Sequence, residues 1–317
     1  MKQKVKFESL LDLNDYFRTE QQCVDYFIKM RWNGVVTCPY KDCQANEFEV
    51  ENNKIYLLRN NNFKCSCCGK IFSYKTGTIF ENSKMPMRKW FMAIYLHTAH
   101  KKDLSSIQLA KYLKTRQATA WFMMQRLRYV EDNNFFNNKF SGINEADEMY
   151  SGGREKNRHM NDRLKGQKEK AVVIGIVNRD TKQAKAIKIE SAKYHILGQQ
   201  IMDNIDIDST LITDDFKGYT TLRTFYNHDT VNHSAGEYVK NDKRKGYKTH
   251  TNSIEGFWSI VKRTINGTHH WLSKKHMQKY LSGMCFRYNT RDFCDTARFD
   301  LFLGQTQGRL KYDVLVG

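Results

Sequence analysis

Residues 250–263, HTNSIEGFWSIVKR, predict an amphipathic helix that lies on a sheet and carries one acid. At roughly 100° per residue, the apolar side chains gather into one stripe, made of Ile254, Phe257, Trp258, Val261 and Ile265. A second stripe beside it holds Glu255, Ser259, Lys262 and Asn266. The acid therefore lies at the edge of the buried face, where the helix meets the open end of the sheet. That position suits a metal-binding carboxylate.

The chain from about residue 141 onward alternates between strand and helix patterns. Three predicted strands come first, GINEADEMY, AVVIGIVNR and AKAIKIES, between residues 142 and 191. A helix at about 194–204 follows, and then the strand STLITDD, a short helix and the strand HDTVNHS. Strands that begin as a meander and then alternate with helices predict a mixed α/β sheet.

Two strand acids are candidates to join Glu255. Asp147 competes with Glu145 and Glu148, and strand alternation places 145 and 147 on one face and 148 on the other. We prefer Asp147 and expect Glu148 to be an outer or surface residue. Asp214 ends an apolar run; Asp215 competes with it, and a helix-capping role is the alternative.

Three acids from distant parts of one chain suit divalent metal chemistry. Mg²⁺ (or Mn²⁺) prefers oxygen ligands, and one or two carboxylates usually hold it together with substrate phosphate oxygens. Two such ions, about 3.5–4 Å apart, stabilise the attacking and leaving oxygens of a phosphoryl displacement. Asp147, Asp214 and Glu255 therefore predict cleavage of a nucleic acid.

The charge of the chain favours a polyanionic partner. The formal net charge is +18 and the sequence pI is about 9.4, which point to nucleic acid. The longest apolar run, residues 171–177, is far shorter than the roughly 20 residues that a membrane span needs. The N-terminus lacks the apolar core of a signal peptide. We expect a cytoplasmic, nucleoid-associated protein without membrane contact, or a nuclear one in a eukaryotic host.

Two short cysteine knuckles, CPYKDC and CSCCGK, indicate a structural Zn²⁺ site in a zinc ribbon. Glycine after the second knuckle lets the backbone turn under a metal, which favours its C-x2-C pair over Cys67. Free thiols in a small domain are the alternative. The predicted ligands are Cys38, Cys43, Cys65 and Cys68.

The segment after the ribbon predicts three helices that resemble a helix-turn-helix. The first begins near Pro86, and the second follows Asp103 or Ser105 as its cap. The third directs Ala120, Trp121, Met124 and Leu127 inward, and it directs three candidate DNA-binding side chains outward, Arg116, Arg126 and Arg128. A helical spacer with merely solvated arginines is the alternative.

Two basic stretches flank the predicted acids, one at 154–170 and one at 240–248. Solvated charge is the ordinary explanation of such runs, but two beside the same acids favour phosphate contacts. We expect Trp271, Tyr280 and Tyr288, further along, to be core residues rather than base-stacking platforms. The candidate DNA contacts around the site are Arg154, Lys156, Lys243, Arg244, Lys245 and Arg263.

Several separated motifs resemble one known family. DEMYSGGREKN, TDDFKGY, HTNSIEGFWSIVKR, GTHHWLSKKHMQKYL and FRYN, in this order, are similar to the ISXO2-like transposase domain of the IS1595 family of insertion sequences. The zinc ribbon followed by GTIFENSKMPMRKWF is similar to the same family. The resemblance implies a ribonuclease-H-like fold. It places the family's acids on Asp147, Asp214 and Glu255, and its lysine on Lys262.

The resemblance also implies an activity. A DDE-type transposase hydrolyses the phosphodiester at the end of its element with two Mg²⁺ ions, and the freed 3′-hydroxyl then attacks target DNA without a covalent protein intermediate. The zinc ribbon and helices would bind double-stranded terminal inverted repeats, and pairing two ends implies a homodimer or a higher oligomer. The competing functions are a non-catalytic zinc-ribbon DNA-binding protein and a metal nuclease that cuts without joining.

The predicted organisation has five parts. A helical lead-in covers 1–34, the zinc ribbon 35–80 and the helical DNA-binding segment 84–132. The catalytic domain covers 140–292, and a C-terminal tail covers 293–317.

Overall fold

The computed structural model describes residues 6–44, 54–59, 61–152, 170–241 and 246–316 of the 317-residue chain. The chain divides into two compact units. One combines Met1–Asn134 with Asp292–Gly317, and the other is Phe135–Arg291.

The first unit is mainly helical, with a small antiparallel sheet. Its elements are α1 (Leu10–Tyr16), α2 (Glu20–Trp32), β1 (Ile55–Leu57), β2 (Phe63–Cys65), β3 (Ile71–Phe72), α3 (Met87–Ala99), α4 (Ser106–Leu113), α5 (Gln117–Asn134), α10 (Asp295–Gly304) and α11 (Tyr312–Val316). The three helices predicted after the ribbon are confirmed as α3, α4 and α5. Ser105 begins α4, because its hydroxyl accepts a bond from the Gln108 backbone at 3.1 Å. The segment predicted as a tail forms α10, which packs against α2 and α3.

The outward direction predicted for Arg126 and Arg128 on α5 is wrong, because both side chains are buried. Arg126 donates to the carbonyl of Ile79 at 2.7 Å, and Arg128 forms an ion pair of 2.8 Å with the buried Asp103. Both arginines lie among other buried residues of α5, and a buried guanidinium is tolerated when it is paired with an acid or hydrogen-bonded to a carbonyl. Of the three DNA contacts predicted for this segment, only Arg116, which immediately precedes α5, is exposed.

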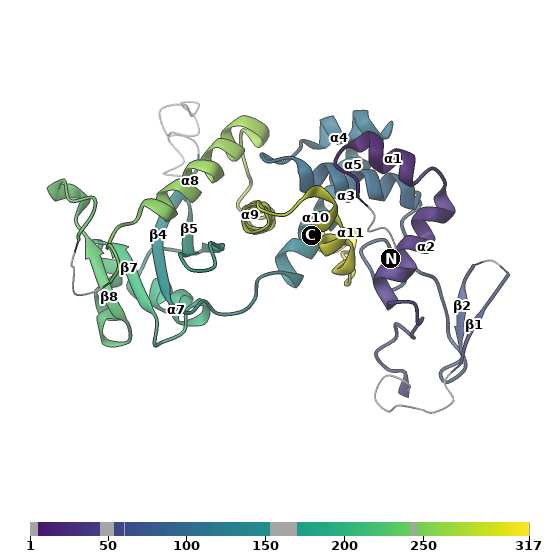
Figure 1. Ribbon diagram of the computed structural model, residues 1–317, viewed down its shortest axis with the longest axis horizontal. Helices are drawn as coiled ribbons and strands as arrows, with labels where there is room; N and C mark the ends of the chain where they lie inside the picture. The colour runs from purple at the N-terminus through teal and green to yellow at the C-terminus, as the bar shows by residue number, and fades with distance from the viewer. Residues whose placement is uncertain (1–5, 45–53, 60, 153–169, 242–245, 317) are drawn as a thin grey trace. The chain divides into compact units, whose positions relative to one another are not determined.

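The second unit is a mixed α/β domain built on a five-stranded sheet, as predicted. The strands are β4 (Ile143–Ser151), β5 (Ala171–Asn178), β6 (Ala184–Ile189), β7 (Thr210–Asp214) and β8 (Asn227–Val231). Their order is β6-β5-β4-β7-β8, with an antiparallel meander of β4, β5 and β6 and with β7 and β8 parallel to β4 (Figure 1). The helices are α7 (Tyr194–Asn204), α8 (Asn252–Thr264) and α9 (Met277–Asn289), with 3-10 turns at Lys217–Thr224 and His233–Ala235 and a π turn at Ile265–His269.

Helices cover both faces of this sheet. Strand alternation in β5 sends Val173 and Val177 toward α8 and α9, and it sends Val172, Ile174 and Ile176 toward α7. In Figure 1, α8 crosses β4 and β5. The apolar stripe predicted for this helix is confirmed, since Ile254, Phe257, Trp258, Val261 and Ile265 are all buried.

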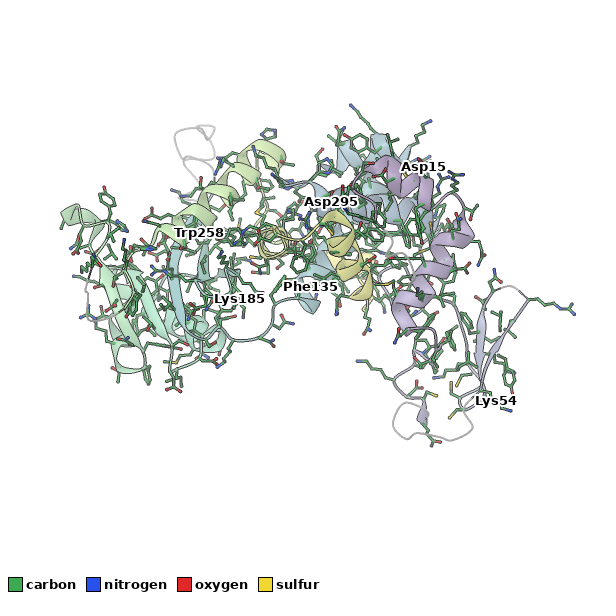
Figure 2. All side chains as sticks on the ribbon, in the orientation of Figure 1. Asp15, Lys54, Phe135, Lys185, Trp258 and Asp295 are labelled. Carbon is green, nitrogen blue, oxygen red and sulfur yellow. The ribbon has the colours of Figure 1, made fainter. Side chains whose placement is uncertain are left out.

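Gly175 permits the close approach of α8 to the sheet. It pairs with Asp147 across the β4–β5 ladder, and the indole of Trp258 lies directly over it. A Cβ atom at position 175 would lie 2.4 Å from Cζ2 of Trp258. Trp258, labelled in Figure 2, therefore packs against β5 at Gly175, the residue that pairs with Asp147.

Candidate functional site

Asp147 and Asp214 lie on adjacent parallel strands. The β4–β7 register pairs Glu145 with Ile212, so the same register continued by two residues sets Asp147 opposite Asp214. Asp214 is the last residue of β7, and its Oδ1 accepts a bond of 3.1 Å from the backbone N–H of Phe216. The carboxyl end of a strand that lies beside another parallel strand is where open α/β sheets hold ligands.

Asp147 is half-buried and held by two donors. The backbone N–H of Glu148 donates to Oδ1 at 2.8 Å, and the indole N–H of Trp258 donates to Oδ2 at 3.0 Å. Burial raises the pKa of Asp147 to about 6, and the charges of Asp214 and Glu255 add to that rise. The charges of the two other predicted acids therefore reach Asp147.

Glu255 is exposed in the first turn of α8. Its Oε1 accepts a bond of 3.2 Å from the hydroxyl of Thr251, the residue that begins the helix. Nε2 of His233 lies 3.4 Å from the same oxygen and 2.9 Å from that hydroxyl. His233 follows β8 in the chain. The sequence interpretation missed it, since its only signal is a histidine at the end of the last strand.

Glu145, the alternative to Asp147 as a metal-binding acid, instead makes buried contacts that connect β4 to α8. Its carboxylate is fully buried, accepts from the backbone N–H of Ile254 at 2.9 Å and pairs with Arg179 at 2.5 Å. Arg179 also donates to the backbone carbonyls of Lys248 and His250, both at 2.6 Å. This network ties β4 and the end of β5 to the first turn of α8, which carries Glu255.

Glu148 is half-buried, on the side of β4 opposite Asp147. The Tyr219 hydroxyl donates to its Oε2 at 2.7 Å. Burial raises the pKa of Glu148 to about 7, and the charges of Asp214 and Asp147 contribute to the rise. Asp215, the rival of Asp214, is exposed.

The basic candidates divide into two groups. Lys262 and Arg263 are exposed on the last turn of α8, and Arg263 donates to the carbonyl of Ser259 on its own helix at 3.1 Å. The remaining candidates around the acids lie outside the described residues, namely Arg154, Lys156, Lys243, Arg244 and Lys245.

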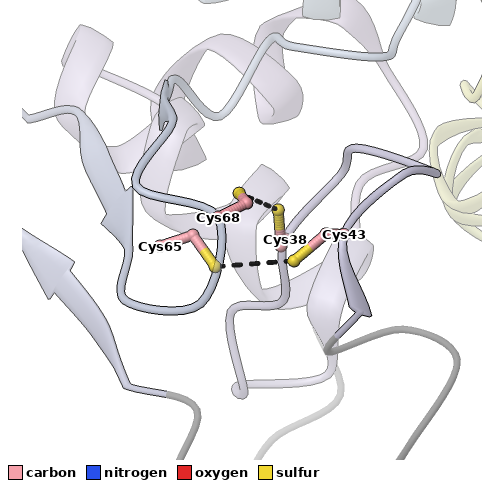
Figure 3. Close-up of side chains that lie close together, drawn as sticks. All are labelled: Cys38, Cys43, Cys65 and Cys68. Atoms are coloured by element: carbon pink, nitrogen blue, oxygen red, sulfur yellow. Dashed lines mark hydrogen bonds between the residues drawn. The ribbon is translucent and has the colours of Figure 1, made fainter.

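The four predicted zinc ligands come together in the first unit. Cys38, Cys43, Cys65 and Cys68 are the one group of possible ligands in the described part of the chain whose donor atoms all lie within 4.8 Å of one another (Figure 3). The sulfurs of Cys38 and Cys68 are 3.8 Å apart, and those of Cys43 and Cys65 are 3.7 Å apart. Four sulfurs held at about 2.3 Å from a tetrahedral Zn²⁺ would be about 3.8 Å apart, so the thiols fit this ion. Cys67 is exposed and lies outside the group.

No helix in the described ranges has the length and apolar character to span a membrane.

The second unit is thus a mixed α/β domain in which the β4–β7 register sets Asp147 opposite Asp214, while α8, which carries Glu255, packs on β4 and β5. Comparison with known proteins identifies it further. Residues 139–289 match the ISXO2-like transposase domain of the IS1595 group, so the resemblance of the motifs in this part of the chain is confirmed. A Halobacterium salinarum protein described as an uncharacterized protein in transposable element ISH50 is 26% identical over 284 residues, which cover 86% of this chain and 91% of that protein.

Proposed function

We propose that the chain is a DDE-type DNA transposase that cuts the ends of an insertion sequence and joins the 3′-hydroxyl ends to target DNA. One observation carries the proposal. The β4–β7 register sets Asp147 opposite Asp214, and Glu255 is in the first turn of α8, the helix that packs on β4. All three acids lie in the part of the chain that matches a transposase family.

The strand order supports a ribonuclease-H-like fold for this domain. An antiparallel meander is followed by two parallel strands on the far side of the first strand. The first acid is then in the middle of the opening strand, the second ends the fourth strand, and the third is on the helix that follows the sheet.

The donor set fits Mg²⁺ or Mn²⁺, because the site offers carboxylate oxygens whose mutual repulsion a cation relieves. Asp147, Asp214 and Glu255 would hold the ions, which supply charge neutralisation at the phosphate and an activated water. Trp258 and the backbone N–H of Glu148 fix the two oxygens of Asp147.

The remaining residues of the site have binding and positioning roles in this proposal. Thr251 orients Glu255 through the bond to its Oε1. Lys262 lies two helical turns beyond Glu255, on the same face of α8, where an ammonium group neutralises DNA phosphate. Arg263 and Arg116 add exposed positive charge for the backbone of double-stranded DNA.

The first unit supplies recognition of the inverted repeats. The Cys38, Cys43, Cys65 and Cys68 thiolates would hold a structural Zn²⁺ that fixes the ribbon between 35 and 80. The helices of 84–132 would bind the repeats, and 140–292 would carry out the chemistry. The protein would act as a homodimer or higher oligomer on DNA, in the cytoplasm at the nucleoid or in a eukaryotic nucleus.

A cleavage and strand-transfer assay tests the function. Purified protein, Mg²⁺ and labelled DNA that carries the element's ends should yield nicked and then joined products. Asp147→Asn, Asp214→Asn and Glu255→Gln should abolish both, while Asp215→Asn, a matched change beside the site, should retain them. Joining by the three variants at the wild-type rate would refute the acid assignment. Nicking without joining would identify a nuclease, and DNA binding without cleavage would identify a non-catalytic DNA-binding protein.

A further inference from the structure

The segment from Gly256 to Arg291 has an unusual charge composition. It contains seven lysines and arginines and no acid, although the whole chain carries 34 acids. The segment begins immediately after Glu255 and includes most of α8, the α8–α9 connection and all of α9. Its exposed cations include Lys262, Arg263, Lys274 and Lys275. These exposed side chains give the segment that follows the proposed third metal ligand a positively charged surface.

Trp271 lies within this surface with 62% of its area exposed. The prediction that it is a core residue is wrong. Trp271 is not part of a helix, because α9 begins only at Met277. Its neighbour Leu272 is buried in the core instead, with 7% of its area exposed. Successive side chains of an extended connection point in opposite directions, so the indole of Trp271 faces solvent.

The backbone around Trp271 is anchored on both sides. The His269 ring meets the Tyr280 ring of α9 edge to face, with centroids 4.8 Å apart, and Leu272 packs in the core between α8 and α9. The backbone N–H of Trp271 donates to the backbone carbonyl of His269 at 2.6 Å. The indole is therefore presented outward from a fixed connection, which lowers the entropy lost when a partner binds it.

An exposed indole among lysines has two physical uses on DNA, stacking on an unpaired base and exclusion of water around it. A second copy of this chain is a poor occupant, because the same surface on both copies would bring like charges together. A nucleic acid strand matches both features, since its phosphates pair with the cations and its bases offer flat rings.

We propose that Trp271 stacks on an unpaired base of the substrate DNA while Lys262, Arg263, Lys274 and Lys275 contact the phosphates of that strand. This proposal rests on the proposed function, since it assumes DNA in the site of Glu255. From Glu255 to the end of the π turn at His269 the helix rises about 20 Å, which corresponds to about six stacked nucleotides. The unpaired base is thus at that distance from the cleaved phosphate.

Fluorescence anisotropy with the full-length protein tests the proposal without added Mg²⁺ and without chelator, so that DNA binds without being cut and the ribbon keeps its zinc. The probes are a duplex of the element's terminal repeat and the same duplex with mismatched bases about six nucleotides from the cleavage point. Trp271→Ala should weaken binding to the mismatched duplex about tenfold, and should weaken binding to the paired duplex much less. Trp271→Phe should recover most of the lost affinity, because its ring still stacks.

Tyr194→Ala is the matched control. Tyr194 is 59% exposed and begins α7, on the opposite face of the sheet, so its loss should leave both affinities unchanged. Equal weakening on both probes, or no weakening, would overturn base stacking. Light scattering that finds the Trp271→Ala variant monomeric and the wild type oligomeric would also overturn base stacking, because Trp271 would then lie between copies of the protein. Cleavage by the wild type in Mg²⁺ is measured separately, so failure of the transposase activity is distinguishable from failure of stacking.

Discussion

Gly175→Ala tests whether the contact between α8 and the sheet sets the position of Asp147. The new Cβ would lie 2.4 and 2.7 Å from two ring carbons of Trp258 and 2.9 Å from Cδ1 of Ile254. Carbon atoms separate to about 3.5–4.0 Å at ordinary contact, so the indole or the whole helix has to move by about 1 Å.

The expected cost follows from these contacts. Overpacking of a filled core costs about 1–3 kcal/mol, and loss of the 3.0 Å bond from Trp258 to Asp147 adds about 1 kcal/mol. In a domain of this size 1 kcal/mol lowers the melting temperature by roughly 2–4 °C. The sum is about 2–4 kcal/mol, so we expect the melting transition of the Phe135–Arg291 unit to fall by roughly 4–16 °C. The cleavage rate should fall more than the affinity for DNA.

Gly256→Ala provides the matched control. Gly256 is on the same helix, and a Cβ there meets no atom within 4 Å. Alanine is the better helix former by roughly 0.5–1 kcal/mol, so this change should raise the melting temperature. Calorimetry of both variants gives the comparison. A Gly175→Ala protein that melts at or above the wild-type temperature and cleaves DNA normally would refute the packing argument.

Three further predictions concern the acids, the cysteines and the arginines. Because burial and like charges raise the pKa of Asp147 to about 6, the folded metal-free chain binds more protons than the unfolded one between about pH 4 and pH 6. This contribution to stability is lost as the pH rises through that window. Asp147→Asn should therefore stabilise the metal-free protein by about 1–3 kcal/mol at about pH 7 and by little near pH 4. Urea titrations at both pH values measure the difference. Cys43→Ser should lower bound zinc measured by mass spectrometry and unfold the ribbon, and zinc retained at the wild-type amount would exclude Cys43 as a ligand. Arg128→Ala should cost about 3–5 kcal/mol in denaturant unfolding, because it breaks the buried ion pair with Asp103, which would keep its contact with His97. Arg116→Ala should leave stability unchanged and reduce the salt dependence of DNA binding by about one ion, and equal stability losses would contradict this division.

Local patterns predicted the elements well. The apolar stripe of α8, the strand runs of the sheet and the serine cap of α4 each depend on neighbours within a few residues. The cysteine knuckles are also local, and the structure gathers their four sulfurs. Such signals are readable because spacing along the chain fixes which side chains share a face.

Side-chain environments were less predictable where long-range packing decides them. Arg126 and Arg128 follow a helical pattern that permits solvent exposure, yet α5 is enclosed and their partners Ile79 and Asp103 come from elsewhere in the chain. The opposite error was made for Trp271, which was predicted to be buried and is exposed. It lies in the connection between the π turn and α9 rather than in a helix.

The sequence by itself predicted the mixed α/β class, the resemblance of residues 139–289 to the ISXO2-like transposase domain and the three acids worth testing. The tertiary structure alone decided how those acids are held. Three contacts join segments far apart in the chain. Asp147 pairs with Gly175, the indole of Trp258 lies over that glycine, and the backbone N–H of Ile254 in α8 donates to Glu145. No spacing rule encodes such contacts, because they depend on how closely a helix approaches a sheet after both have formed.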